Sequence, residues 1–241
     1  MILILKHIPI EGPGTIAEFF DQQQIDYKIV ELSQGERLPG SLKDIDGIVV
    51  LGGPMNVYED EQHPFLKDED AFIRNVLKEG LPYLGICLGS QLLAKSSDAL
   101  VKKAAQKEIG WALIQQTEDG KDDPLFAGLD EQLIAFQWHE DTFDIPPLGR
   151  LLSMSDVVPY QAFKVGQYAY GLQYHIEVDR DIIASWVTEY FKVAKAQESK
   201  EGKKMLDQFE QLKAQYSKQA KQIYRNFVDI VETAKQEKLS V

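Results

Sequence analysis

Apolar residues in the first part of the chain follow two alternating patterns. Short apolar runs bounded by polar residues, glycine or proline predict strands at residues 2–5, 26–31, 46–51 and 81–86. Apolar residues that recur every three or four positions predict helices at residues 15–23 and 65–77. Strands that alternate with helices imply right-handed crossovers, so we expect an α/β fold with a doubly wound, mostly parallel sheet.

The pattern changes after residue 111 to short strands separated by turns. The predicted strands are residues 112–116, 133–136, 151–154, 161–165 and 168–173. This spacing is typical of hairpins, so we expect a small antiparallel extension of the sheet. An amphipathic helix is predicted next, at residues 180–191.

The last stretch of the chain carries one apolar stripe. Its members recur three, four or seven positions apart: Met205, Phe209, Leu212, Tyr216, Ile223, Phe227 and Ile230. This spacing predicts one long amphipathic helix, or two with a break. We therefore divide the chain into a globular domain at residues 1–194 and a helical C-terminal extension at residues 195–241. We expect the stripe to pack on the domain, and the alternative is a surface for a homodimer or another partner.

Composition limits the classes of function. The chain has 241 residues, 44% of them hydrophobic, and a formal net charge of −12. A nucleic-acid partner would need a basic face, so this charge argues against one. Residues 195–241 differ from the rest, with ten Lys or Arg against seven Asp or Glu. The charge therefore separates an acidic body from a mildly basic tail.

The apolar runs and the cysteine count indicate the compartment. The longest apolar runs, such as residues 48–51, are far too short to cross a membrane. Residues 1–5 lack the basic flank and the length of a signal peptide. A single cysteine rules out an internal disulfide and is typical of a reducing compartment. We therefore expect a cytoplasmic protein with no membrane association.

Residues 81–94 hold the strongest candidate for chemistry. An apolar strand pattern runs into Cys87, which lies between Gly85 and Gly89, and a helical pattern follows at once. A turn this tight strains its central residue and needs small neighbours. This is the arrangement of a nucleophile elbow with a thiol in place of a hydroxyl, and the helix start favours the reactive thiolate. The alternative is that Cys87 is only a small buried hydrophobic residue.

A cysteine nucleophile needs a base and a group that orients the base. Among the four histidines, His175 is followed two residues later by Glu177, and at a strand end both side chains project to one side. Glu177 can therefore orient the ring of His175. His7 and His139 also fall at predicted strand ends, whereas His63 lies in a charged loop and is expected to be solvated.

Gly53 supplies a third candidate element. It follows the predicted strand at residues 46–51, where a backbone without a side chain can approach a substrate closely. Its N–H and that of Leu88 would form an oxyanion hole. In a parallel sheet Gly53 and Cys87 lie at the same edge, outside the carboxyl ends of the strands. The alternative is that Gly52-Gly53-Pro54 is only a turn.

These candidates belong to motifs that lie in order along residues 1 to about 192. Three of them are Leu51-Gly52-Gly53-Pro54, Gly85-Ile86-Cys87-Leu88-Gly89-Ser90-Gln91 and Gly171-Leu172-Gln173-Tyr174-His175-x-Glu177. Together they resemble the signature blocks of the class I glutamine amidotransferases. Four others resemble the amidotransferase domain of GMP synthase: His7…Glu11-Gly12-Pro13-Gly14, Gly53-Pro54-Met55-Asn56-Val57-Tyr58, Glu108-Ile109-Gly110-Trp111 and Trp138-His139-Glu140-Asp141.

The resemblance implies a flavodoxin-like sheet and a catalytic triad. By this resemblance Cys87 is the nucleophile, His175 is the base and Glu177 orients it. Gly53 and Leu88 are the oxyanion hole.

The resemblance also implies two substrate-binding residues. Gln91 matches a glutamine that contacts the amino-acid end of the substrate, and His139 matches the loop that lines the glutamine pocket. We expect neither a cofactor nor a metal ion.

Two positions depart from the family pattern. The family usually has His-Pro-Glu, and here Ile176 replaces the proline, which predicts a free N–H and a less rigid turn. After the elbow helix the family usually has Gly-Gly, where this chain has Asp98-Ala99. Asp tolerates the left-handed conformation of a helix stop, so we expect some local reshaping there.

The reaction implied by the resemblance is hydrolysis of the γ-amide of glutamine through a γ-glutamyl thioester on Cys87, which releases glutamate and ammonia. The alternatives are a hydrolase of γ-glutamyl peptides or conjugates, and a non-catalytic binding or regulatory module on the same fold. The sequence has no G-x-x-x-x-G-K-[ST] loop. The ammonia would therefore go to a separate synthetase subunit, or the enzyme would act alone.

Overall fold

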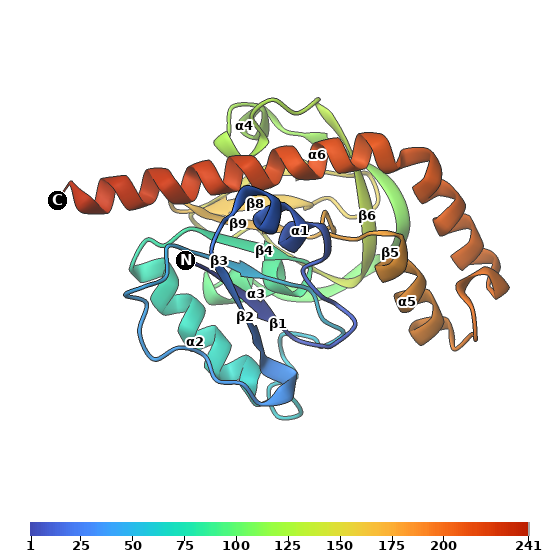
Figure 1. Ribbon diagram of the computed structural model, residues 1–241, viewed down its shortest axis with the longest axis horizontal. Coiled ribbons are helices and arrows are strands. Elements are labelled where there is room, and N and C mark those ends of the chain that lie inside the picture. Colours follow the sequence, from blue (N-terminus) through green and yellow to red (C-terminus); the bar gives the residue numbers. More distant parts are fainter. Residues whose placement is uncertain (241) are drawn as a thin grey trace.

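One nine-stranded sheet organises the chain, and the computed structural model describes residues 1–240 (Figure 1). Five strands pair in parallel, in the order β2 (Tyr27–Glu31), β1 (Ile2–Lys6), β3 (Gly47–Val50), β4 (Tyr83–Ile86) and β9 (Ala169–Leu172). The sheet continues with antiparallel strands in the order β8 (Ala162–Val165), β7 (Gly149–Met154), β5 (Val101–Gln116) and β6 (Gln132–Phe143). The predicted α/β fold is confirmed, and its parallel part has the flavodoxin-like strand order.

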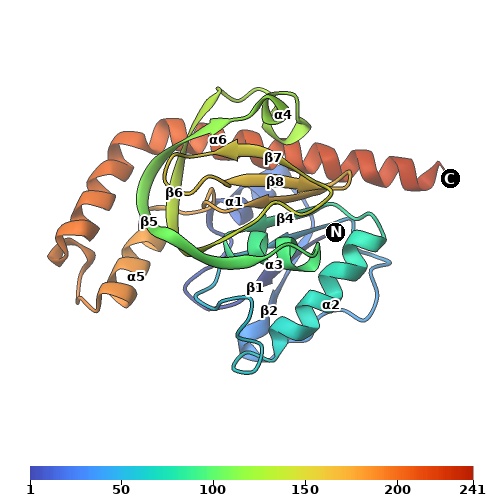
Figure 2. The ribbon, with the colours of Figure 1, turned by 180° about the vertical axis from the view of Figure 1, so that it is seen from behind.

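Helices cover both faces of the sheet (Figures 1 and 2). α1 (Gly14–Gln23) and α6 (Lys200–Leu239) share one core cluster with Ile4 of β1, and α2 (Phe65–Lys78) and α3 (Leu88–Ser96) share another with Leu5. Neighbouring residues of a strand point to opposite faces, so these clusters are the two sides of a three-layer core. The remaining helical segments are α4 (Glu118–Lys121), α5 (Arg180–Phe191), and short 3₁₀ turns at Leu32–Gln34, Pro124–Phe126 and Ala196–Glu198.

The C-terminal stripe packs against the sheet as one continuous helix, α6. Ser199 caps its start, because the Ser199 hydroxyl accepts a hydrogen bond from the Gly202 N–H at 3.1 Å. Tyr224 and Phe227 are each 1% exposed and lie in the same cluster as α1. The expected packing is confirmed, whereas the division of the chain at residue 194 stays a prediction.

Two antiparallel strands are longer than predicted. β5 begins at Val101 instead of residue 112, and β6 continues to Phe143 instead of ending at residue 136. The early half of β5 is hidden in the sequence because its outward side chains are polar and a register shift interrupts the pairing between Lys103 and Glu108. His139 pairs with Glu108 in the middle of β6, so the prediction that it lies at a strand end or in a loop is wrong.

The turn after α3 has the left-handed conformation that was predicted for Asp98, which stands where the family usually has glycine. Asp98 has a φ of 64°, in the left-handed region, and its carboxylate accepts a hydrogen bond from Arg74 at 3.0 Å. An aspartate can therefore end this helix where the family has glycine.

Within residues 1–240, no helix has the length and apolar character that a membrane crossing requires.

Candidate active site

Cys87 sits on a strained turn between β4 and α3. Its φ of 50° and ψ of −106° lie outside the regions that L-residues ordinarily occupy. A Cβ on Gly85 would lie 2.4 Å from the Gly89 carbonyl oxygen, and one on Gly89 would lie 2.2 Å from the Val50 carbonyl oxygen. Both neighbours must therefore be glycine, and the predicted strand, sharp turn and helix are present.

His175 and Glu177 come together just after β9. The Nδ1 of His175 donates to Oε1 of Glu177 at 2.7 Å, and both side chains are buried. This bond fixes the tautomer and leaves Nε2 for the substrate side. A Cβ built on Gly52 would lie 3.0 Å from Cε1 of His175 and 3.6 Å from Cβ of Cys87, so the ring and the thiol are neighbours.

The charges around His175 favour its protonated form. Burial alone would lower the pKa of His175, but the Glu177 carboxylate and the Cys87 sulfur raise it by more, so the pKa lies well above its usual value. The raised pKa favours the imidazolium form of the ring. An imidazolium beside a cysteine favours the thiolate, which is the nucleophile.

The N–H of Ile176 has a definite partner. It donates to Oε2 of Glu177 at 2.9 Å, while Oε1 of the same carboxylate holds His175. Ile176 is 3% exposed, and its carbonyl accepts a 2.5 Å hydrogen bond from Tyr224. The predicted free N–H at Ile176 is therefore wrong, because the N–H that proline would lack helps to hold the carboxylate.

Replacing Ile176 with proline is expected to lower the catalytic turnover about tenfold. Proline removes the N–H that fixes Oε2 of Glu177, and a carboxylate free to rotate orients His175 less well. Steady-state kinetics on glutamine would measure this, with Ile176→Val as a control that keeps the N–H. A proline variant that turns over as fast as the parent, with its fold intact by circular dichroism, would contradict this role for the N–H.

Gly53 lies where a close approach requires glycine. A Cβ there would lie 2.8 Å from Cδ2 of Leu88 and 3.0 Å from Cβ of His7. Leu88 is the first residue of α3, so its N–H is one of the groups that a helix leaves without an internal partner. Both candidate oxyanion donors are thus next to Cys87 in the fold.

His7 contributes to this region in a way that its sequence position alone does not reveal. Its Nδ1 donates to the Gly52 carbonyl at 2.9 Å, and its Nε2 lies 3.0 Å from both carboxylate oxygens of Glu69. Burial lowers the pKa of His7, but Glu69 raises it by more, and each ring nitrogen faces oxygen atoms that accept hydrogen bonds. The Gly52 carbonyl and the Gly53 N–H belong to one planar peptide. Holding the carbonyl therefore fixes where that N–H points.

A cavity of about 240 Å³ lies over Cys87. Among the predicted site residues Gly53, Cys87, Gln91, His139 and His175 line it, whereas Glu177 lies behind His175 and Leu88 is fully buried at the helix start.

Two of the lining side chains are already engaged within the protein. Gln91 donates to Gln173 at 3.3 Å and to the Asp141 carbonyl at 3.4 Å. The ring nitrogens of His139 bond the Asp141 carbonyl at 2.9 Å and Glu108 at 3.1 Å. The substrate-binding roles of Gln91 and His139 stay predictions.

Glu11 and Tyr190 line the same cavity and were not predicted as site residues. Tyr190 donates to Glu11 at 3.2 Å, and burial raises the pKa of Glu11 despite the nearby His175. The sequence signals for Glu11 are its place in the loop after β1 and its membership of the block His7…Glu11-Gly12-Pro13-Gly14. No cluster of three or more His, Cys, Asp or Glu side chains suited to a metal ion occurs in residues 1–240.

Comparisons with known proteins agree with this geometry. A family model described as glutamine amidotransferase class-I matches residues 15–183. A glutamine amidotransferase-like protein of Salmonella typhimurium is 30% identical over 174 residues, which cover 71% of this chain and 73% of that protein. A glutamine-hydrolyzing GMP synthase of Thermomicrobium roseum is 36% identical over 146 residues, which cover 60% of this chain but only 26% of the relative. The crystal structure of a glutamine amidotransferase from Thermotoga maritima is similar with a TM-score of 0.84, 34% identity and coverage of 96% and 97%.

Proposed function

Because the chain belongs to the class I glutamine amidotransferase family, we propose that it hydrolyses the γ-amide of glutamine through a γ-glutamyl thioester on Cys87. The observation that carries this proposal is one cavity that joins the strained Cys87 to the His175–Glu177 pair. The same arrangement argues against a non-catalytic module, because a binding module needs neither a strained thiol nor an oriented base.

The proposed first half of the reaction forms the thioester. The Cys87 thiolate attacks the δ-carbon of glutamine, and the carbonyl oxygen becomes an oxyanion between the N–H groups of Gly53 and Leu88. As this intermediate collapses, the carbon–nitrogen bond breaks and His175 gives its proton to the departing ammonia.

The second half hydrolyses the thioester. A water molecule gives a proton to His175 while its oxygen attacks the thioester carbon, and the carbon–sulfur bond then breaks. Glutamate leaves, and the thiolate and the imidazolium of His175 are restored. Glu177 transfers no proton and keeps the ring aligned throughout.

The test is turnover by the purified protein of glutamine and of a γ-glutamyl dipeptide, followed through glutamate release. We expect glutamine to be the better substrate, because a cavity of about 240 Å³ suits a single amino acid. A clear preference for the dipeptide would favour the γ-glutamyl conjugate hydrolase instead. No turnover of either compound, with the fold intact, would contradict both enzymes.

The fate of the ammonia is a separate proposal. The match covers 26% of the Thermomicrobium roseum GMP synthase, so this chain corresponds to a minor part of that protein. We propose that the ammonia passes to a separate synthetase subunit, in the cytoplasm, where the thiol stays reduced. We also propose that residues 195–241 are an extension of the catalytic domain at residues 1–194, which the end of the family match at residue 183 supports.

A further inference from the structure

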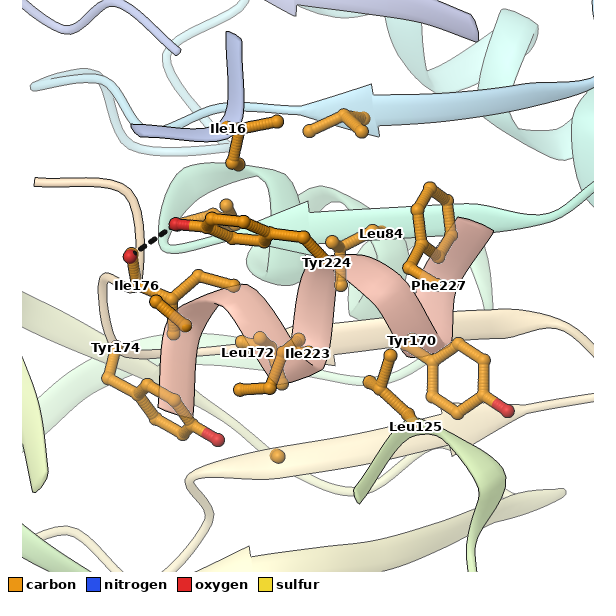
Figure 3. Close-up of a cluster of buried hydrophobic side chains, with 14 of the residues drawn as sticks. Ile16, Leu84, Leu125, Tyr170, Leu172, Tyr174, Ile176, Ile223, Tyr224 and Phe227 are labelled. Carbon is orange, nitrogen blue, oxygen red and sulfur yellow. Dashed lines mark hydrogen bonds between the residues drawn. The ribbon is translucent and has the colours of Figure 1, made fainter. Parts of the chain in front are cut away.

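The turn that carries His175 and Glu177 is held from outside by groups that donate to its carbonyls. The hydroxyl of Tyr216 donates to the His175 carbonyl at 3.3 Å. The hydroxyl of Tyr224 donates to the Ile176 carbonyl at 2.5 Å, as the dashed line in Figure 3 shows. The Glu177 carbonyl accepts the backbone N–H of Thr15 at 3.0 Å. Three consecutive peptide groups are therefore fixed, two of them by tyrosines of α6.

Tyr224 is itself held in place by α1. Its hydroxyl lies 2.8 Å from the hydroxyl of Thr15, which also lies 3.2 Å from the Glu177 carbonyl oxygen. The Tyr224 ring packs against Phe19 with centroids 5.6 Å apart, and its side chain is almost fully buried. A hydroxyl with two partners in a dry core has little freedom to move.

The hydroxyl is not needed to fill space. Phe227, one turn further along α6, packs into the same cluster without a polar atom. Burying a hydroxyl destabilises the fold unless the hydroxyl makes a hydrogen bond. The hydroxyl at position 224 is therefore favourable only because of the bond that it makes. That bond ends on the peptide between the base and its orienting carboxylate.

We propose that α6 is a positioning element of the active site: the hydroxyls of Tyr224 and Tyr216 hold the backbone of residues 175–177 so that His175 stays aligned with Cys87. This inference rests on the proposed function, because it takes His175 and Glu177 as the base and its orienting group. The family match ends at residue 183, before α6 begins at Lys200. The alignment of the base would thus depend on a helix outside the matched region.

The experiment compares the full-length parent with Tyr224→Phe and Phe227→Leu. The first variant removes one hydroxyl and keeps the ring, and the second loosens the packing of the same helix and keeps the hydroxyl. Deleting α6 would be less informative, because it would also expose the apolar core that the helix covers.

Two readouts separate positioning from mere stability. The first is the split between kcat and KM for glutamine. The second is alkylation of the thiol by iodoacetamide, which needs no substrate and reports on Cys87 alone because the chain has one cysteine. The titratable groups that act on His175 and Tyr190 include Glu177, Glu11 from the loop after β1, and Tyr190 itself from α5. The cavity is also lined by Lys103 of β5 and by His139, Glu140 and Asp141 of β6, and none of these groups is changed.

We expect Tyr224→Phe to lower kcat about tenfold while KM stays within about twofold, because the base is misplaced and the substrate pocket is not. The alkylation rate at neutral pH should fall relative to its plateau at high pH, because the thiolate loses its aligned imidazolium. Phe227→Leu should match the parent in kcat and in the alkylation profile.

Parental kcat and alkylation in Tyr224→Phe would overturn the inference, and so would equal losses in both variants, which would assign the effect to packing. If Tyr224→Phe does not fold, Thr15→Val removes a hydroxyl that contacts both Tyr224 and the Glu177 carbonyl, and it should lower kcat and the alkylation rate in the same direction by less. A parent without glutaminase activity would defeat the proposed function, and the alkylation comparison would still decide this inference.

Discussion

Replacing Cys87 with alanine or serine is expected to lower glutamine turnover by about 10⁴-fold or more while the protein stays folded. The thiol is the only cysteine in the chain, so no other side chain can form the thioester. Both substitutions are small and keep the glycines on either side of the turn. Serine would also test the sulfur itself, because a hydroxyl at this position is far harder to ionise.

Steady-state kinetics and thermal unfolding of both Cys87 variants would check this expectation. A midpoint of unfolding close to that of the parent shows that activity, and not the fold, has been lost. Turnover at the parental level in either variant would contradict thioester chemistry at Cys87.

Removing His175 should be nearly as damaging as removing the nucleophile, because members of a triad act as a unit. His175→Ala is expected to lower kcat by about 10³-fold or more. His63→Ala is the matched control, since His63 lies in the loop before α2, where its ring packs against Phe65 with centroids 5.9 Å apart. A loss in His63→Ala equal to that in His175→Ala would contradict the assignment of the base.

Glu177→Gln should lower kcat by less than His175→Ala does, and it should change the pH dependence of kcat/KM. Glu177 raises the pKa of His175, so without its charge that pKa falls. The alkaline limb of kcat/KM, where the imidazolium loses its proton, should therefore move to lower pH. An unchanged alkaline limb, or a larger fall in kcat than in His175→Ala, would mean that Glu177 does not orient the base.

The sequence predicted the parts of the site that lie close together along the chain. The glycines around Cys87 are required by backbone contacts that any such turn makes, so the spacing is informative. His175 and Glu177 are two residues apart at a strand end, and that spacing alone makes their 2.7 Å bond feasible. These local constraints can be recognised without knowing the rest of the fold.

Contacts between distant segments could not be predicted in this way. His7 bonds Gly52, and Tyr224 bonds Ile176, across 45 and 48 positions of the sequence. Tyr224 was not among the predicted members of the apolar stripe, and spacing alone does not distinguish a tyrosine that only fills the core from one that bonds the active-site turn. The error about Ile176 has the same origin, because its N–H is satisfied by a carboxylate whose rotamer is set by tertiary packing.

The extent of β5 and β6 was missed for a related reason. Strand propensity is weak in residues 101–111, and only pairing with β6 makes them a strand. That pairing continues through His139 and carries it to the wall of the cavity. A site built on such long-range pairing needs the three-dimensional structure to be seen.

The most direct test of the central claim is the intact mass of the protein after incubation with a glutamine analogue whose γ-amide is replaced by a diazoketone. A nucleophilic Cys87 in a glutamine pocket predicts one adduct per chain, mapped to Cys87 by peptide analysis, slowed by free glutamine and absent from Cys87→Ala. A folded parent whose mass does not change, or an adduct that persists in Cys87→Ala, would contradict the claim that Cys87 is the nucleophile of a glutamine-hydrolysing site.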